Sequence, residues 1–147
     1  MSLSKNMIQV KNFGGVVYEE RTAGEAGIKP GMLCRVGTDG KAYKHNAEGG
    51  KCECLVAIED SLQGRTVDDA YDIDTPVRLV RFRPGEEFHG LLNSHVNVDI
   101  GENVVSYGNG LFRSASDSGS YTAYAVAMVL EASAGETSDT LIHMRAL

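Results

Sequence analysis

Apolar and polar residues alternate over many short segments of the chain, and Gly, Pro, Asn or Asp residues separate the segments. Alternation with a period of two places the apolar side chains on one face, which is typical of a half-buried β-strand. The turn residues recur roughly every 8–12 positions, a spacing typical of sandwiches and barrels. The strands that we expect cover residues 8–10, 16–18, 32–36, 41–43, 52–58, 76–82, 88–92, 96–100, 103–107, 111–114, 121–131 and 140–144.

A helical pattern is weak throughout the chain. Residues 61–75 favour a single helical turn inside an acidic loop, because Thr66 precedes Asp69 by three positions as in a helix-capping pair. Strands and helices do not alternate along the sequence, as they would in a protein with a parallel sheet. We therefore predict an all-β fold, a single-domain antiparallel β-sandwich or barrel of the jelly-roll or β-tulip-like type.

Residues 1–20 are expected to be extended, with Gly14 and Gly15 interrupting the apolar pattern. This segment is either an extended N-terminal arm that reaches a neighbouring subunit or the first strand of the domain. The pattern leaves both alternatives open. Residues 21–147 then form the single β domain.

Two hairpin turns are predicted from local sequence. Asp39-Gly40 favours a type I′ turn, in which both central residues have positive φ. Gly108-Asn109-Gly110 predicts a second hairpin between two apolar segments.

The chain also contains a weak internal echo. A shift of 70 positions superposes several turn glycines and one apolar strand, which indicates two similar β units at about residues 27–60 and 97–131. The echo reflects either a duplication or the shared need of turns for glycine. The matched pairs are Gly31 and Gly101, Gly40 and Gly110, Gly49 and Gly119, Val56 and Val126, and Ala57 and Ala127.

Composition narrows the class of protein. The hydrophobic content of 42% is ordinary for a globular domain, and 17 Gly against 3 Pro indicates many turns. The net charge of −6 argues against a nucleic-acid-binding role, because such binding rests on Lys and Arg. No apolar run reaches the roughly 18 residues of a membrane span, and the first residues lack the apolar core of a signal peptide. We expect a location in the cytosol or in a particle assembled there.

Cationic residues gather at one place. Arg78, Arg81 and Arg83 alternate along a predicted strand. They indicate either a solvated strand face or a docking surface for an acidic partner.

The three cysteines do not predict a disulfide framework. Cys52 and Cys54 lie two apart on a predicted strand, and Cys34 with His45 completes a set that zinc accepts in principle. The spacing lacks a C-x₂-C knuckle, and free cysteine is among the most buried residue types. Core packing is therefore the favoured interpretation.

His89 lies in a frame similar to the second metal-binding motif of cupins, with Pro84 five positions before it and Asn93 four after it. The partner motif, with two histidines and a glutamate on an earlier strand, is absent. A cupin-like metal-binding jelly-roll enzyme is kept as an alternative that the sequence disfavours.

The remaining polar residues give weaker indications of a catalytic or binding site. Ser94, His95 and Asp99 are sequence neighbours, which seldom supply triad geometry. Adjacent carboxylates at Glu86-Glu87 and Asp68-Asp69 point apart and are expected to be solvated. No phosphate-binding glycine motif is present. We expect no enzyme, no cofactor and no metal.

Two stretches resemble the capsid decoration (cement, or head-stabilising) proteins of tailed bacteriophages. They are VAIEDSLQGRTVDDAYDIDTPVRLVRFRPGEEFHGLL and VDIGENVVSYGNGLFRSAS, and the match covers residues 57–115. The resemblance implies a small all-β virion protein that binds the outer surface of the major capsid protein shell and stabilises the head. It also implies a homodimer or homotrimer. From the net charge and the lack of a long apolar run, we expect neither nucleic acid nor a membrane as partner.

Two regions are predicted as contacts with the capsid or a neighbouring subunit: the segment 4–18 and the loop 65–71. A carbohydrate- or receptor-binding module of a tail or fibre is a further alternative, weakened because Trp is absent and aromatic residues total 7%. The predicted contact residues are Ser4, Lys5, Met7, Ile8, Val10, Phe13, Val16, Tyr18, Arg65, Asp68, Asp69 and Tyr71.

Overall fold

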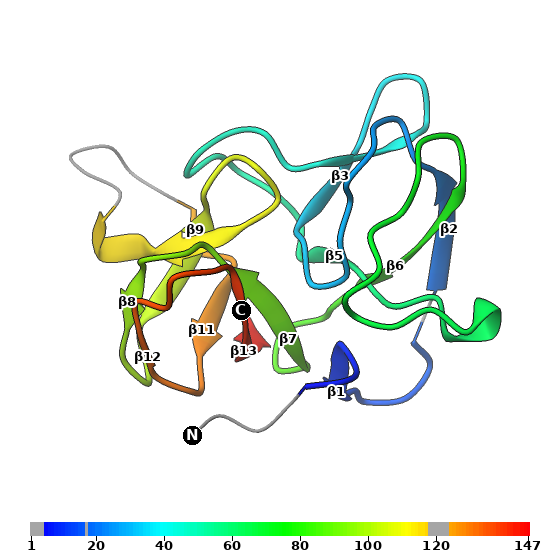
Figure 1. The fold of residues 1–147 in the computed structure, drawn as a ribbon. Coiled ribbons are helices and arrows are strands. Elements are labelled where there is room, and N and C mark those ends of the chain that lie inside the picture. The colour runs from blue at the N-terminus through cyan, green and yellow to red at the C-terminus, as the bar shows by residue number, and fades with distance from the viewer. Residues whose placement is uncertain (1–4, 17, 118–123) are drawn as a thin grey trace.

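A computed structural model describes residues 5–16, 18–117 and 124–147. The described chain is built from short strands and two single-turn 3₁₀ helices, which confirms the predicted all-β class (Figure 1). The elements are β1 (Gln9–Lys11), β2 (Tyr18–Thr22), β3 (Cys34–Val36), β4 (Ala42–Lys44), β5 (Leu55–Ala57), η1 (Ser61–Gln63), β6 (Pro76–Arg81), β7 (Glu87–Leu92), β8 (Asn97–Val98), β9 (Asn103–Ser106), β10 (Phe112–Ser114), η2 (Ala115–Asp117), β11 (Ala127–Val129), β12 (Ser133–Ala134) and β13 (Thr140–Ala146).

Strands β2 to β6 form a first unit whose pairings close into a ring. Strand β6 pairs antiparallel with both β2 and β5, and β3 pairs antiparallel with β4. A bridge between Leu33 and Val56 joins β3 to β5, and a parallel bridge between Ala23 and Ala42 joins β2 to β4. The first unit is therefore a small barrel.

Strands β7 to β13 form a second unit with the same order of pairings. Strand β13 pairs antiparallel with β7 and β11, β11 with β9, and β9 with β10. The ring closes through a parallel bridge between Phe112 and Leu92, which matches the bridge between Ala42 and Ala23. Figure 1 shows the first unit on the right and the second on the left.

The two rings also share a backbone hydrogen bond and a glycine conformation. The Gly31 amide donates to the Ala57 carbonyl, and the Gly101 amide donates to the Val129 carbonyl, each at 2.8 Å. Gly31 and Gly101 have φ of 91° and 94°, a conformation that favours glycine. The two similar units span residues 18–81 and 87–146 and are thus longer than the echo in the sequence indicates.

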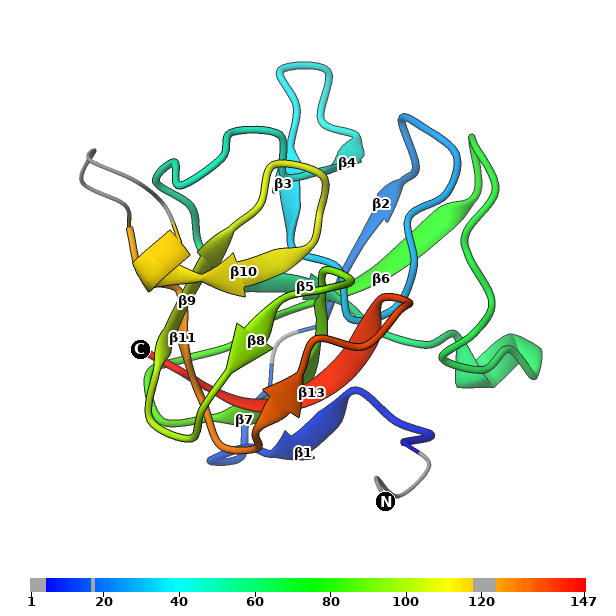
Figure 2. The same cartoon turned by 60° about the vertical axis from the view of Figure 1, so that its left-hand side comes forward.

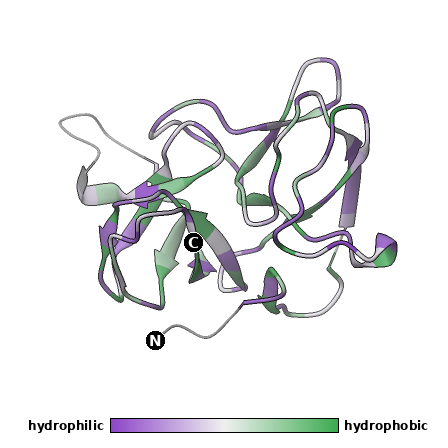
Figure 3. Cartoon of the chain, in the orientation of Figure 1, coloured by the Kyte–Doolittle hydropathy of each residue, from purple (hydrophilic) through white to green (hydrophobic). Residues whose placement is uncertain are grey.

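The apolar core joins both units. One cluster combines side chains on the outer face of the first unit, such as Leu33 and Val80, with the interior of the second, such as Phe112 and Met144. A separate cluster fills the first barrel and includes Ala42. In Figure 3 the hydrophobic stretches follow the strands of both units, and β2 is a hydrophilic exception. Continuous packing therefore holds the two units together.

Backbone hydrogen bonds also cross between the units. The Leu33 amide donates to the Gly110 carbonyl at 2.7 Å, and the Leu91 amide donates to the Gly31 carbonyl at 2.9 Å. Strand β1 pairs antiparallel with β7 along the edge of the second unit (Figure 2). Both β1 and β2 are thus strands of the chain's own sheets.

Both predicted hairpins form, and one of them differs in the type of its turn. The hairpin at Gly108-Asn109-Gly110 joins β9 and β10 as predicted. At Asp39-Gly40 the predicted type I′ turn is wrong: Gly40 has φ of 79°, but Asp39 does not have positive φ. The loop is one residue longer, with the Gly40 amide donating to the Gly37 carbonyl at 2.9 Å, as in a three-residue hairpin whose last residue is left-handed.

In the acidic loop, the single helical turn lies at η1, earlier than Thr66. Part of the predicted strand at 121–131 lies outside the described residues, and its described part forms β11.

Candidate contact surfaces

Strand β1 is fastened to the body of the protein at several points. The Ile8 carbonyl accepts from the His89 amide at 2.8 Å, and the Ile8 amide donates to a Glu59 carboxylate oxygen at 3.1 Å. His89 Nδ1 donates to the Met7 carbonyl at 2.7 Å, and Lys5 forms an ion pair of 3.0 Å with Glu131. These contacts fix the strand with one side chain, Ile8, turned into the core.

Glu86 anchors the end of this segment. The residue is 1% exposed, and its carboxylate accepts from the Phe13 amide at 3.1 Å and from the Arg83 amide at 2.6 Å. The Arg83 guanidinium lies 3.0 Å from it and donates to the Gly14 carbonyl at 2.5 Å. Burial opposes ionisation of Glu86, but these hydrogen bonds and the Arg83 charge outweigh it and lower the pKa of Glu86. Glu86 was expected to be solvated, and the structure corrects this because its carboxylate is the buried acceptor for two chain segments.

The predicted contact residues of this segment divide into buried and exposed groups. Ile8 is fully buried in this chain's own core, while Val16 and Lys5 are partly buried. The exposed fractions of four apolar residues are 52% for Met7, 43% for Val10, 59% for Phe13 and 51% for Tyr18. Ser4 lies outside the described residues. The apolar surface that this segment offers therefore comes from the exposed group.

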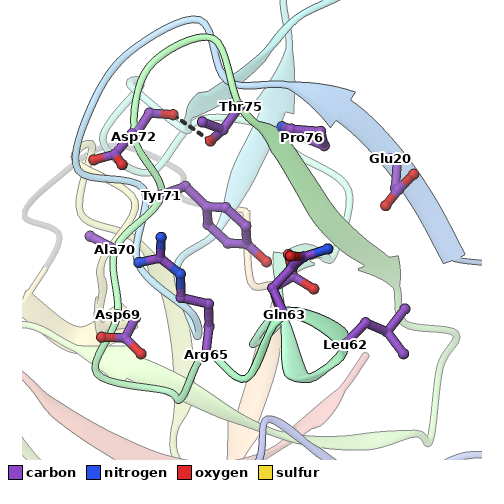
Figure 4. A pocket seen from close by; sticks show the side chains of 11 residues that line it. Glu20, Leu62, Gln63, Arg65, Asp69, Ala70, Tyr71, Asp72, Thr75 and Pro76 are labelled. Atoms are coloured by element: carbon purple, nitrogen blue, oxygen red, sulfur yellow. Dashed lines mark hydrogen bonds between the residues drawn. The ribbon is translucent and has the colours of Figure 1, made fainter.

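The second predicted region borders a pocket of about 380 Å³. Figure 4 shows Arg65 and Asp69 from the loop, with the Tyr71 ring above Arg65 and Glu20 on β2 at the right. Four carboxylates and one guanidinium line the pocket, so its charge is negative. The lining residues are Glu20, Asp60, Leu62, Gln63, Arg65, Asp69, Ala70, Tyr71, Asp72, Thr75 and Pro76.

Local hydrogen bonds hold the shape of this loop. Asp69 accepts from the Thr66 amide at 2.8 Å, and its own amide donates to the Thr66 carbonyl at 3.1 Å. The bond from the Thr66 amide lowers the pKa of Asp69. Tyr71 is 9% exposed and donates from its hydroxyl to the Ile58 carbonyl at 2.7 Å, and burial raises the pKa of Tyr71 to about 12. Tyr71 thus supports the loop, whereas Arg65 and Asp68 are exposed.

A buried polar pair that the sequence did not reveal links the two units. His45 follows β4, Ser106 ends β9, and His45 Nδ1 lies 2.6 Å from Ser106 Oγ. The Gly108 amide donates to the same Oγ at 3.2 Å, and His45 Nε2 lies 3.4 Å from the Lys51 carbonyl. This arrangement assigns the imidazole proton to Nε2 and the Ser106 proton to the bond with Nδ1. Burial lowers the pKa of His45.

The candidate metal ligands do not assemble. The described residues contain no group of three or more His, Cys, Asp or Glu side chains placed to hold a metal ion. Cys34 lies in the core of the first barrel, whereas Cys52 and Cys54 pack against the shared cluster. Burial raises the pKa of Cys34 to about 12 and that of Cys52 to about 11, so these thiols stay protonated at neutral pH.

The cupin-like frame around His89 gains no support from the structure. His89 stands opposite His143 across β7 and β13, and their rings meet edge to face at 5.7 Å. His143 Nε2 donates to Glu87 at 2.7 Å. Burial lowers the pKa of His89, which is consistent with a neutral donor to the Met7 carbonyl.

The neighbours Ser94, His95 and Asp99 do not form a triad. The Ser94 amide donates to Asp139, the Asp99 amide donates to Glu102, and His95 lies exposed in a turn with φ of 64°. Asp99 and His95 thus belong to local turns, and the Ser94 amide binds a distant segment of the chain.

The predicted arginine cluster is divided among separate partners. Arg83 binds Glu86, and Arg78 lies over the Tyr18 ring, with 5.3 Å from its guanidinium carbon to the ring centre. Arg81 pairs with Glu53 at 2.8 Å and with Glu19 at 3.2 Å. Arg81 instead joins a different cationic group at the mouth of the first barrel.

Among the described residues, no helix is long and apolar enough to cross a membrane. Comparison with known proteins returns neither a matching family model nor a matching curated protein.

Proposed function

We propose that this protein is a capsid decoration protein of a tailed bacteriophage. In this proposal it binds the outer surface of the major capsid protein shell, stabilises the head and acts by binding alone, without catalysis or a cofactor. It is made in the host cytoplasm, associates as a homodimer or homotrimer, and ends on the outer surface of the virion. The sequence motifs between residues 57 and 115 are the starting point for this proposal.

The observation that carries the proposal is the exposed apolar surface of the N-terminal segment. Met7, Val10 and Phe13 leave roughly half of their surface in solvent, although the strand that bears them is hydrogen-bonded to β7 and anchored by Glu86. A fixed backbone lowers the entropic cost of docking these side chains. Apolar residues held in this way are suited to a protein contact.

The remainder of the molecule is consistent with a binding role. The molecule consists of two barrels packed on a shared core, and a stable interface needs about 800 Å² from each partner. On a symmetric shell, many copies and more than one contact per copy multiply a modest affinity.

The proposal is tested on purified virions that carry the protein. We expect cryo-electron microscopy to place it on the outside of the shell, and we expect the isolated protein to co-sediment with shells from which it has been stripped. Its absence from purified particles would overturn the assignment.

A paired set of variants tests the contact surface. The double variant Val10→Ser and Phe13→Ser should lower shell affinity by about tenfold or more, because it removes two apolar contacts. Ile100→Ser is the matched control, since Ile100 is 69% exposed on the second unit. Equal losses in both variants would show that the N-terminal segment is not the contact.

A further inference from the structure

The mouth of the first barrel is a cationic groove in an acidic protein. A hollow of about 560 Å³ opens there, with Cys34 and Leu55 of the barrel core among the residues that line it. The other lining residues include four cations, Arg21, Arg35, Lys51 and Arg81, and one carboxylate, Glu53. We name these four cations the mouth cations. The chain as a whole has a net charge of −6, so this is a local reversal of sign.

Comparison of the two barrels shows how the mouth arises. Strand register places Glu19 opposite Leu79 and Arg21 opposite Val77 in the first unit. The same register in the second unit places Phe88 opposite Met144 and Gly90 opposite Ile142.

At the end of the ring, Arg81 stands opposite Leu55, as Ala146 stands opposite Ala127. Three inward positions that are apolar in the second barrel are therefore charged in the first.

The second barrel is sealed at these positions by aromatic packing. Phe88 stacks on Phe82 with ring centres 4.7 Å apart and meets Phe112 at 6.0 Å. Phe88 and Phe112 are fully buried. In the first barrel no aromatic ring replaces them at Glu19 and Ala42, and the mouth stays open to solvent.

Two of the mouth cations, Arg21 and Arg81, are paired with carboxylates within the chain. Glu19 pairs with Arg21 at 2.7 Å and with Arg81 at 3.2 Å, and Glu53 pairs with Arg81 at 2.8 Å. Two carboxylates therefore balance these two cations, so the set of four mouth cations leaves an excess of positive charge in the groove.

The other two mouth cations supply this excess. Within the described part of the chain, Arg35 and Lys51 form no ion pair with a carboxylate. Arg35 Nε is buried and has no hydrogen-bond partner there, while its guanidinium lies 4.7 Å from the centre of the Tyr43 ring. An arginine and a lysine that line an open hollow without a carboxylate partner among the described residues are suited to an incoming anion.

We propose that this groove binds adjacent carboxylates on an acidic segment of a partner polypeptide. The guanidinium of Arg35 and the ammonium of Lys51 meet the carboxylates, and the Arg21–Glu19–Arg81 network holds the wall of the groove. The groove is open at the surface and large enough for one or two side chains, and the overall negative charge of the protein disfavours a long nucleic acid. The inference concerns the isolated protein and does not depend on the capsid proposal.

The test is fluorescence anisotropy with a labelled hexaglutamate peptide at low ionic strength. We expect saturable binding that weakens as salt is added, and no binding of a hexaglutamine peptide. The double variant Arg35→Gln and Lys51→Gln should weaken binding by about tenfold or more, since each lost charge removes a direct contact.

A matched control separates the groove from net charge. Lys29→Gln with Arg145→Gln removes the same charge outside the groove and outside both predicted contact regions, and should leave the affinity unchanged. Lys51→Glu alone, in an exposed loop residue, should also abolish most binding even if the double variant fails to fold.

Several results would overturn the inference: no binding of hexaglutamate, equal losses in the groove and control variants, or tighter binding of inorganic phosphate or of a single-stranded oligonucleotide. Because no capsid enters this assay, a failure here is distinct from a failure of the capsid proposal.

Discussion

A single buried carboxylate, Glu86, joins the N-terminal segment to the second unit through Phe13 and Arg83. Replacement by Gln keeps the shape but removes the charge that the Arg83 guanidinium faces. We expect Glu86→Gln to lower the free energy of unfolding at pH 7 by about 1–3 kcal/mol, measured by urea denaturation. Glu136→Gln, at an exposed position, should change it by less than about 0.5 kcal/mol.

The effect of Glu86 should also depend on pH. Its pKa is lower in the folded protein than in the unfolded chain, so its contribution is present above the ordinary carboxyl pKa of about 4.3 and is lost as the pH falls through the folded value. The gap between wild type and Glu86→Gln should narrow below about pH 4.3. A gap that widens in acid would contradict this account.

The buried pair of His45 and Ser106 allows a second test at the level of single residues. Ser106→Ala leaves His45 Nδ1 without a donor, and we expect a loss of about 1–3 kcal/mol in unfolding free energy. Ser61→Ala, on the exposed η1 turn, is the control.

Burial lowers the pKa of His45, so its contribution to stability is present above the ordinary value of about 6.5 and declines as the pH falls below it. NMR titration of the His45 imidazole should give a midpoint below about 6.5, and a higher midpoint would refute the buried neutral state.

Among the elements, β1 and the residue just before it carry two apolar side chains with different expected roles. Ile8 is fully buried, whereas Val10 is 43% exposed. Ile8→Ala should cost about 2–4 kcal/mol through the lost apolar contact and the cavity that remains. Val10→Ala should cost less than about 0.5 kcal/mol, and both are measured by urea denaturation. If Val10→Ala is as destabilising as Ile8→Ala, the outer face of β1 is part of the fold and not a free contact surface.

Elements that depend on residues close in sequence can be predicted, and elements that depend on distant residues cannot. The hairpin at Gly108-Asn109-Gly110 is local, and its sequence predicts it. The turn at Asp39 differs by one residue because Asp-Gly is compatible with more than one hairpin loop. Closure of each barrel depends on the parallel bridges at Ala42 and Phe112, which join strands distant in sequence and leave no periodic signal.

The candidate site shows the same dependence on long-range pairing. The exposed apolar residues of the N-terminal segment follow from a local apolar pattern, whereas the mouth cations Arg21, Arg35, Lys51 and Arg81 come from separate segments. Alternating strand positions did not show that Arg21 and Arg81 face inward, because that orientation is defined by their partners Val77 and Leu55. The strand pairings of the first barrel identify Arg21 and Arg81 as residues that face inward.

For the whole molecule, the way in which the two barrels are joined predicts that they unfold together. The shared apolar cluster draws Leu33 and Val80 from the first unit and Phe112 and Met144 from the second. The two units also exchange backbone hydrogen bonds, including the one from Leu33 to Gly110. Opening one barrel would expose the apolar face of the other, so partial unfolding forfeits much of the apolar burial.

Hydrogen exchange in native conditions measures this coupling directly. We expect the slowest amides of β6 and β13 to open with the same free energy, equal to the value from urea denaturation. Leu33→Ala, which weakens the shared cluster, should lower both by the same amount, about 2–4 kcal/mol. A smaller opening free energy for β6 alone would mean that the first barrel unfolds by itself, and the groove at its mouth would then be supported by a unit less stable than the protein as a whole.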